Sequence, residues 1–174
     1  MDINNNPLVK KAYASPKLRQ HLLNKGTMFL YCDYAGFPLH KAYGAACCTV
    51  FDRTISLSAK KLPISEDHGS NYGEIMAIIF SLETLAAARA GLEHQPKIAV
   101  VYTDCIRIPH LLAHPQAEGE PGRKELLTAL AKFNRRLPDI KLQIKYISKH
   151  KKNNCLHRLA HNAAREAARS FILS

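Results

Sequence analysis

The sequence predicts an α/β fold, in which helices flank a mixed sheet of five strands, three antiparallel strands followed by parallel ones. Two observations predict this arrangement. Three apolar segments near the start follow one another with only short connections, which is typical of an antiparallel meander. Two later strand-like segments are separated by segments of helical periodicity, which is typical of helices packed on a mixed sheet. A chain of 174 residues with 47% hydrophobic residues is long enough for one such domain.

The first three strands are expected at residues 27–35, 43–52 and 54–62. Gly36-Phe37-Pro38 supplies turn residues for the first connection, and Asp52-Arg53 makes a tight second one. These short connections favour neighbouring antiparallel strands over parallel ones.

The remaining elements alternate between helices and strands. Residues 71–90 carry apolar side chains at helical spacing, whereas residues 97–104 are apolar on both faces, as in a central strand covered by helices. Residues 140–146 alternate apolar and polar side chains, as in a half-exposed strand. Further helices are expected at residues 105–114, 123–136 and 154–172.

Residues 1–26 are predicted to be a basic N-terminal extension that precedes a domain at residues 27–174. Ser15-Pro16 is typical of a helix start, and Leu18, Leu22 and Leu23 give a short helix one apolar stripe. Two interpretations stay open for this segment. It is either an accessory arm that binds nucleic acid or a solvated, partly disordered tail.

The charge of the chain limits its partners. Lys and Arg number 25 against 14 Asp and Glu, a net charge of +11, which favours a polyanion such as nucleic acid unless the charge serves only solubility. No signal peptide and no membrane-spanning apolar run is evident, so we expect a cytoplasmic protein with no membrane contact. The five cysteines have no C-x-x-C spacing and are expected to be reduced core residues.

Three carboxylates stand at the boundaries of predicted elements. Asp33 directly follows the apolar run Phe29–Cys32, where an unpaired carboxylate is costly to bury, so it either caps the next loop or binds a cation. Glu74 fits a capping box in which Asn71 is the N-cap residue of a helix. Asp104 fits the N-cap position of the helix that follows it. If the three converge instead, their repulsion requires cations. From the residues alone both interpretations stay open.

The order of elements and four short motifs resemble the ribonuclease H family over roughly residues 27–170. This chain differs from the usual family pattern in one site residue: His157 stands where the fourth acidic residue of the family usually stands. The motifs are Asp33-Tyr34-Ala35-Gly36 at the end of the first strand, Asn71–Ile78 with the family glutamate at Glu74, Thr103-Asp104-Cys105 with cysteine in place of serine, and Asn153–Ala160 at the start of the last helix.

The resemblance implies a site with two Mg²⁺ or Mn²⁺ ions. Its catalytic and metal-binding residues would be Asp33, Glu74, Asp104 and His157, with Glu74 also reaching the ribose 2′-hydroxyl. His150 would take the role of a mobile catalytic histidine, and His161 is expected to turn toward solvent. Asn71, Lys149, Lys151 and Lys152 are the expected nucleic-acid contacts, although the lysine run also fits an ordinary solvated loop.

The function that follows is an endoribonuclease, a phosphodiester hydrolase that cuts the RNA strand of an RNA–DNA hybrid by a two-metal mechanism. We expect it to act as a monomer on the hybrid duplex. Two alternatives use the same fold: a non-catalytic nucleic-acid-binding module, and a different nuclease or resolvase that cuts branched or DNA-only substrates.

Overall fold

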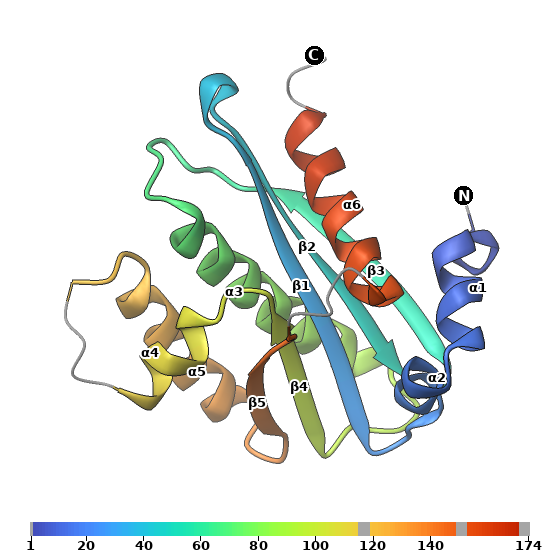
Figure 1. Ribbon diagram of the computed structural model, residues 1–174. Coiled ribbons are helices and arrows are strands. Elements are labelled where there is room, and N and C mark those ends of the chain that lie inside the picture. Colours follow the sequence, from blue (N-terminus) through green and yellow to red (C-terminus); the bar gives the residue numbers. More distant parts are fainter. Residues whose placement is uncertain (1, 115–118, 149–152, 171–174) are drawn as a thin grey trace.

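The computed structural model describes residues 2–114, 119–148 and 153–170, and its strands form one mixed sheet (Figure 1). The strand order is β3-β2-β1-β4-β5. β1 pairs antiparallel with β2, and β2 with β3, whereas β4 runs parallel to both β1 and β5. This confirms the predicted sheet. The strands are β1 Thr27–Phe37, β2 Ala42–Phe51, β3 Thr54–Lys61, β4 Ile98–Thr103 and β5 Lys141–Tyr146.

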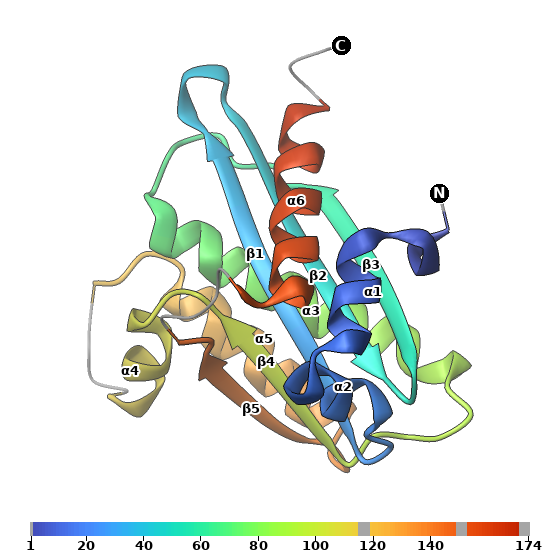
Figure 2. The same ribbon diagram turned by 45° about the vertical axis from the view of Figure 1, so that its right-hand side comes forward.

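Helices cover both faces of the sheet (Figures 1 and 2). One face carries α3 Ser70–Ala88, α4 Arg107–Ala113 and α5 Arg123–Arg136, and the other carries α1 Pro7–Ala14, α2 Pro16–Leu23 and α6 Cys155–Arg169. Side chains of β1 alternate between the two cores, as the pleat of a strand requires. Leu30 and Cys32 join the core beneath α3, whereas Phe29 and Tyr31 join the core beneath α6.

α6 lies close against the sheet because small residues meet at the contact. Ala160, Ala164 and Ala168 are fully buried on α6 at a spacing of four residues, which places them in one row. Opposite them, Gly44 of β2 leaves no room for a Cβ, which would meet backbone atoms of Ala164 and Ala168. This close approach brings the side chains at the start of α6 within reach of β1.

A second glycine brings α3 to the sheet. A Cβ on Gly73 would meet the ring of Tyr34, so only glycine lets this ring pack directly against the first turns of α3. The next residue in the helix is Glu74, whose position relative to β1 is therefore fixed by the Tyr34 contact.

The N-terminal segment is folded rather than a solvated tail. Besides the expected helix α2, it forms α1, which the sequence analysis did not predict. Val9, Ala12, Leu18 and Leu22 are buried and join the core beneath α6. Its lysines remain exposed, so the packing does not decide whether the segment also binds nucleic acid, and the boundary at residue 27 stays a prediction.

The predicted elements agree with the structure to within a few residues. The largest difference is at the end of the expected helix 154–172, since α6 ends at Arg169. The expected helix 71–90 also ends early, because α3 stops at Ala88 and a 3₁₀ turn, η3 Arg89–Gly91, follows. Short 3₁₀ turns also form at η1 Ile3–Asn5 and at η2 Pro38–His40, between β1 and β2. Cys32, Cys47 and Cys48 are buried core residues, as expected, whereas Cys105 and Cys155 are only partly buried.

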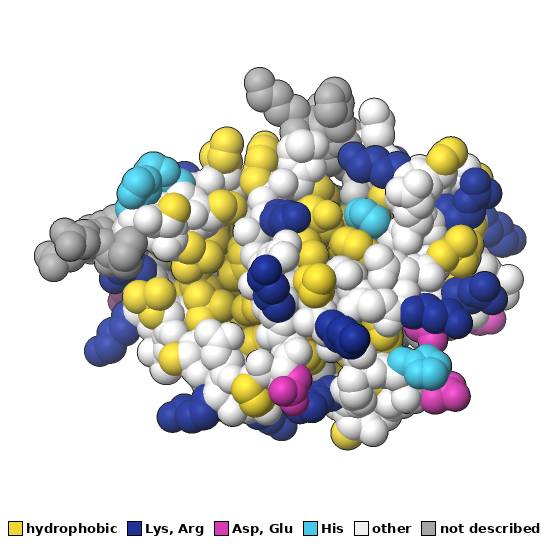
Figure 3. Space-filling model, turned by 90° about the horizontal axis from the view of Figure 1, so that it is seen from below, with side chains coloured by type: hydrophobic (Ala, Val, Ile, Leu, Met, Phe, Trp, Pro, Cys, Tyr) yellow, Lys and Arg dark blue, Asp and Glu magenta, His cyan; other side chains and the backbone are white. Residues whose placement is uncertain are grey.

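The surface reflects the basic composition. Seen from the underside in Figure 3, lysine and arginine side chains are spread over the molecule and acidic ones are few. In the part of the chain that the structure describes, no helix combines the length and the apolar character that crossing a bilayer requires.

Candidate active site

The site forms where β1 and β4 separate. Their parallel pairing ends at Tyr31 and Tyr102, after which β1 continues with β2 alone. Asp33 lies two residues beyond this point and shares the side of the sheet occupied by Tyr31 and α6. Asp104 directly follows β4, so both carboxylates lie just beyond the point where the parallel pairing of β1 and β4 ends. This is where open α/β sheets commonly bind ligands.

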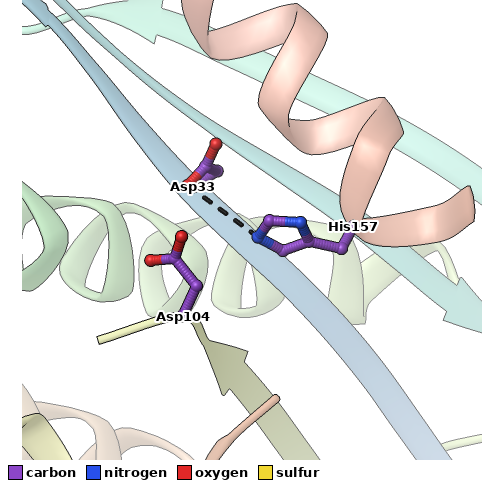
Figure 4. A group of neighbouring side chains, drawn as sticks. All are labelled: Asp33, Asp104 and His157. Atoms are coloured by element: carbon purple, nitrogen blue, oxygen red, sulfur yellow. Dashed lines mark ion pairs between the residues drawn. The ribbon is translucent and has the colours of Figure 1, made fainter. Parts of the chain in front are cut away.

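α6 supplies the third member of the cluster. Its first turn is capped by Asn154, whose Oδ1 accepts hydrogen bonds from the backbone N–H groups of Leu156 and His157, both at 3.0 Å. The cap fixes His157, which is 5% exposed, with Nε2 at 3.8 Å from Asp33 Oδ1. Figure 4 shows the Asp33, Asp104 and His157 side chains pointing toward one another from β1, the end of β4 and α6.

The donor set fits a hard divalent cation. One ligand atom each from Asp33, Asp104 and His157 lie within 4.8 Å of one another. Two ligands of one Mg²⁺ lie at most about 4.2 Å apart at bond lengths of about 2.1 Å. The cluster thus needs to contract by only some tenths of an ångström. Oxygen ligands suit Mg²⁺ and Mn²⁺, whereas an imidazole is better accepted by Mn²⁺.

Glu74 approaches from the opposite face of the sheet. It is 8% exposed, and its Oε2 is buried without a hydrogen-bond partner among the described residues. An unsatisfied buried carboxylate oxygen is costly in a folded protein, so it marks a position where a ligand would be stabilising. The capping-box interpretation of Glu74 is wrong, because α3 begins at Ser70 with Gly69 as its N-cap and no side-chain cap.

The carboxylates repel one another in the metal-free protein. Burial raises the pKa of Asp33 to about 6, with a further contribution from the charge of Asp104 and an opposing one from His161. Burial also raises the pKa of Glu74 well above its usual value, and the charges of Asp33 and Asp104 add to this. Such clustered, raised pKa values are typical of functional sites. A cation between these groups would remove the repulsion.

His161 is exposed, as expected, but it also contacts the site, which the sequence analysis did not predict. Its Nδ1 lies 2.7 Å from Asp33 Oδ2, a distance at which the ring N–H donates to the carboxylate. The side chain is still 47% exposed, so one edge of the ring reaches solvent while the other holds Asp33. The sequence carried a signal for this contact, because His161 follows His157 by four residues and shares its face of α6.

The other expected residues lie nearby or outside the described residues. Asn71 is part-buried and contacts Glu120 and the Cys105 thiol, each at 3.3 Å. The N-cap interpretation of Asp104 is wrong, because α4 has Ile106 as its N-cap. His150, Lys149, Lys151 and Lys152 lie outside the described residues, so their roles stay predictions.

A part-buried hydrogen-bond chain connects the N-terminal segment to the site, and the sequence analysis did not predict it. The Tyr31 hydroxyl lies 2.7 Å from Nδ1 of His21 in α2 and also bonds the side chain of Asn154, the cap of α6. The His21 ring stacks on Phe29 with centroids 3.9 Å apart. Burial lowers the pKa of His21, which favours the neutral ring that accepts the tyrosine hydrogen. α2 therefore supports the turn that carries His157.

Of the comparisons with known proteins, the one with solved structures supports the architecture. No protein-family model matches the sequence, and a search of curated proteins found no match. Among solved structures, LC11 ribonuclease H1 in complex with an RNA/DNA hybrid aligns with a TM-score of 0.63 at 20% identity, over 84% of this chain and 99% of that one.

Two further structures align at similar levels. Ribonuclease H1 from Halobacterium salinarum has a TM-score of 0.58 at 19% identity, over 82% of this chain and 97% of its own. The N-terminal ribonuclease H domain of rv2228c from Mycobacterium tuberculosis has a TM-score of 0.59 at 15% identity, over 84% and 99%. Together with the observed strand order and the helices on both faces, these likenesses show that the chain has the ribonuclease H fold.

Proposed function

We propose that this protein is a metal-dependent endoribonuclease that hydrolyses the RNA strand of RNA–DNA hybrids. The observation that carries the proposal is the convergence of Asp33, Asp104 and His157 on one point, beside the buried Glu74, at the carboxyl ends of the central strands. The likeness to a ribonuclease H1 solved with an RNA/DNA hybrid supports the same substrate class. We also retain the prediction of a cytoplasmic monomer.

The residues of the site have separate tasks in this proposal. Asp33, Asp104 and His157 would hold divalent cations, which supply an activated water and neutralise charge developing on the leaving oxygen. His161 holds Asp33 by donating to Oδ2, which leaves Oδ1 directed at the cluster. Asp33 lies within β1 and Asp104 directly follows β4, so the sheet places both carboxylates before a cation binds.

Glu74 supports the choice of RNA. Its Oε2 is a buried acceptor that lacks a donor among the described residues, and a ribose 2′-hydroxyl is a donor that DNA does not have. A site built to bond a hydroxyl discriminates strongly against a substrate that lacks it, because the acceptor then stays unpaired.

A non-catalytic nucleic-acid-binding module remains the second candidate, and one contact favours it. His161 already occupies Asp33 Oδ2, and His157 contributes no negative charge of its own at neutral pH, so the cluster attracts a second cation less strongly than four carboxylates would. Activity measurements separate the two candidates.

The test is cleavage of an end-labelled RNA–DNA hybrid with Mg²⁺, with Mn²⁺ or with EDTA, beside duplex DNA and single-stranded RNA of the same sequence. The proposal expects metal-dependent cutting of the RNA strand of the hybrid, abolished by Asp104→Asn. The matched control is Asp139→Asn, which changes an exposed carboxylate between α5 and β5 and should cleave like the parent. Binding without cleavage under every metal condition would support the second candidate instead.

A further inference from the structure

A row of basic side chains leads along α6 away from the carboxylates. His157, His161, Arg165 and Arg169 follow one another at intervals of four residues, which places them on one ridge of the helix with a rise of about 6 Å per step. The first two contact Asp33, and the last two continue the row toward the end of the molecule where β1 turns into β2 (Figure 1).

Both arginines are oriented by the same aromatic ring. The guanidinium carbons of Arg165 and Arg169 lie 5.4 and 5.5 Å from the centroid of Phe37, within the range of cation–π contacts. Among the described residues, neither guanidinium forms an ion pair with a carboxylate. The ring therefore restricts the two side chains, while their N–H donors stay available for an anion.

Arg165 also shares a hollow with the candidate active site. The hollow has a volume of about 320 Å³ and is lined by Glu74 and His161 from the site, by Arg165, and by residues at the end of β1. Asp67 is a second carboxylate in the lining, and its Oδ1 accepts a hydrogen bond from the backbone N–H of Gly69. Because the hollow adjoins Glu74, a strand whose ribose contacts Glu74 would have an adjacent phosphate near Arg165.

The connection between β1 and β2 extends the same surface. Leu39 at its tip is 98% exposed, and His40 and Lys41 beside it are also exposed. The surface thus combines basic side chains with apolar contact area, next to a site whose own charge is negative. This combination favours a polyanion that has both phosphates and apolar faces, as nucleic acid does.

We propose that Arg165 and Arg169 bind successive backbone phosphates of the nucleic-acid strand that enters the active site, with Arg165 contacting its phosphate in the hollow beside Glu74. Guanidinium groups bind phosphate oxygens through paired N–H donors, and stacking on Phe37 reduces the rotamer freedom lost on binding. This inference rests on the proposed function, because it takes the strand in the site to be the substrate. It assigns to α6 a binding role beyond holding His157.

The test measures binding separately from cleavage. Affinity for a labelled RNA–DNA hybrid is measured in EDTA across a salt titration, in an Asp104→Asn background that does not cleave. Arg165→Gln and Arg169→Gln should each reduce the slope of log K against log salt by about 0.9, and the double variant by about twice that. Duplex DNA should show a similar loss, because phosphate contacts carry no sequence information.

Two control variants sharpen the result. Arg158→Gln removes an exposed arginine of the same helix that does not line the hollow, and its slope should equal that of the parent. Arg165→Lys keeps the charge but loses the planar group that stacks on Phe37, so it should keep the slope and bind more weakly. Melting temperatures equal to the parent establish that the variants are folded.

The outcomes separate this inference from the proposed function. Parental slopes in Arg165→Gln and Arg169→Gln, in a protein that cleaves hybrid, overturn the phosphate-binding role alone. Reduced slopes in a protein that never cleaves support the phosphate-binding role and contradict the enzyme. No measurable hybrid binding by the Asp104→Asn protein overturns the inference outright.

Discussion

Replacing Asp33 with asparagine is expected to make the metal-free protein more stable at neutral pH. Asp33 is almost fully buried, and the pKa of its carboxyl is raised from 3.8 to about 6 by burial and by the charge of Asp104. A shift of about 2 units at about 1.36 kcal/mol per unit means that ionised Asp33 lowers the free energy of unfolding by about 3 kcal/mol. Asparagine is neutral and of similar shape, so it should recover about 1–3 kcal/mol.

The pH dependence of the free energy of unfolding tests separately whether ionised Asp33 is destabilising. Because the pKa of Asp33 is higher in the folded protein than in the unfolded chain, the folded state binds more protons between about pH 4 and pH 6. The stability contributed by the protonated group is complete below about pH 4 and is lost as the pH rises through about 6. Asp33→Asn should lack this fall in stability.

The assay is denaturant unfolding in EDTA at about pH 4 and about pH 7, on the parent, Asp33→Asn and the exposed control Asp139→Asn. A second arm adds Mn²⁺, which should stabilise the parent by about 2.7 kcal/mol at a hundredfold excess over its Kd and stabilise Asp33→Asn less. Lower stability of Asp33→Asn at neutral pH would mark Asp33 as a structural residue and refute the reasoning from repulsion.

Three further predictions concern other parts of the site and its surroundings. The parent should cleave hybrid better with Mn²⁺ than with Mg²⁺. His157→Asp should raise the cleavage activity with Mg²⁺, and His157→Ala should lower it with both ions. Unchanged cleavage by His157→Ala would show that this residue does not belong to the site. Tyr31→Phe should lower the free energy of unfolding by about 1–3 kcal/mol, because it removes the hydroxyl that bonds both His21 and the side chain of Asn154; equal urea midpoints would contradict this. Lys10→Gln with Lys11→Gln should flatten the salt dependence of hybrid binding if the N-terminal segment is a nucleic-acid-binding arm, and an unchanged salt dependence would contradict that role. Both are surface substitutions, which leave the core contacts of α1 in place.

Much of the fold follows from short-range patterns. The apolar run before Asp33, the tight connection at Asp52-Arg53 and the fully apolar segment before Asp104 each identify a strand without tertiary information. The end of β1 was harder to predict, because Gly36 and Phe37 are typical of a turn but pair with β2 in the structure. α1 was missed because it is short, and its stabilisation comes largely from packing against other elements, among them α6 and α2.

The site was predictable where a residue type contradicts its surroundings. A charged residue after a buried strand, as at Asp33 and Asp104, signals a ligand because burial without one is costly. The role of Glu74 was harder to predict, because Asn71 and Glu74 have the spacing of a capping box. Only the structure excludes that cap, since α3 begins at Ser70 and Asn71 therefore lies inside the helix. The contact of Tyr31 with Asn154 joins residues far apart in sequence, so no local pattern reports it.

The most direct test of the central claim is the chemistry of the cleaved ends. If water hydrolyses the RNA strand at the Asp33, Asp104 and His157 cluster, the products carry a 5′-phosphate and a 3′-hydroxyl, and they form only from hybrid with Mg²⁺ or Mn²⁺ present. The paired histidines offer a contrasting mechanism, in which His157 and His161 act as acid and base while the ribose 2′-hydroxyl attacks. Products ending in a 2′,3′-cyclic phosphate, formed equally well in EDTA, would contradict the account.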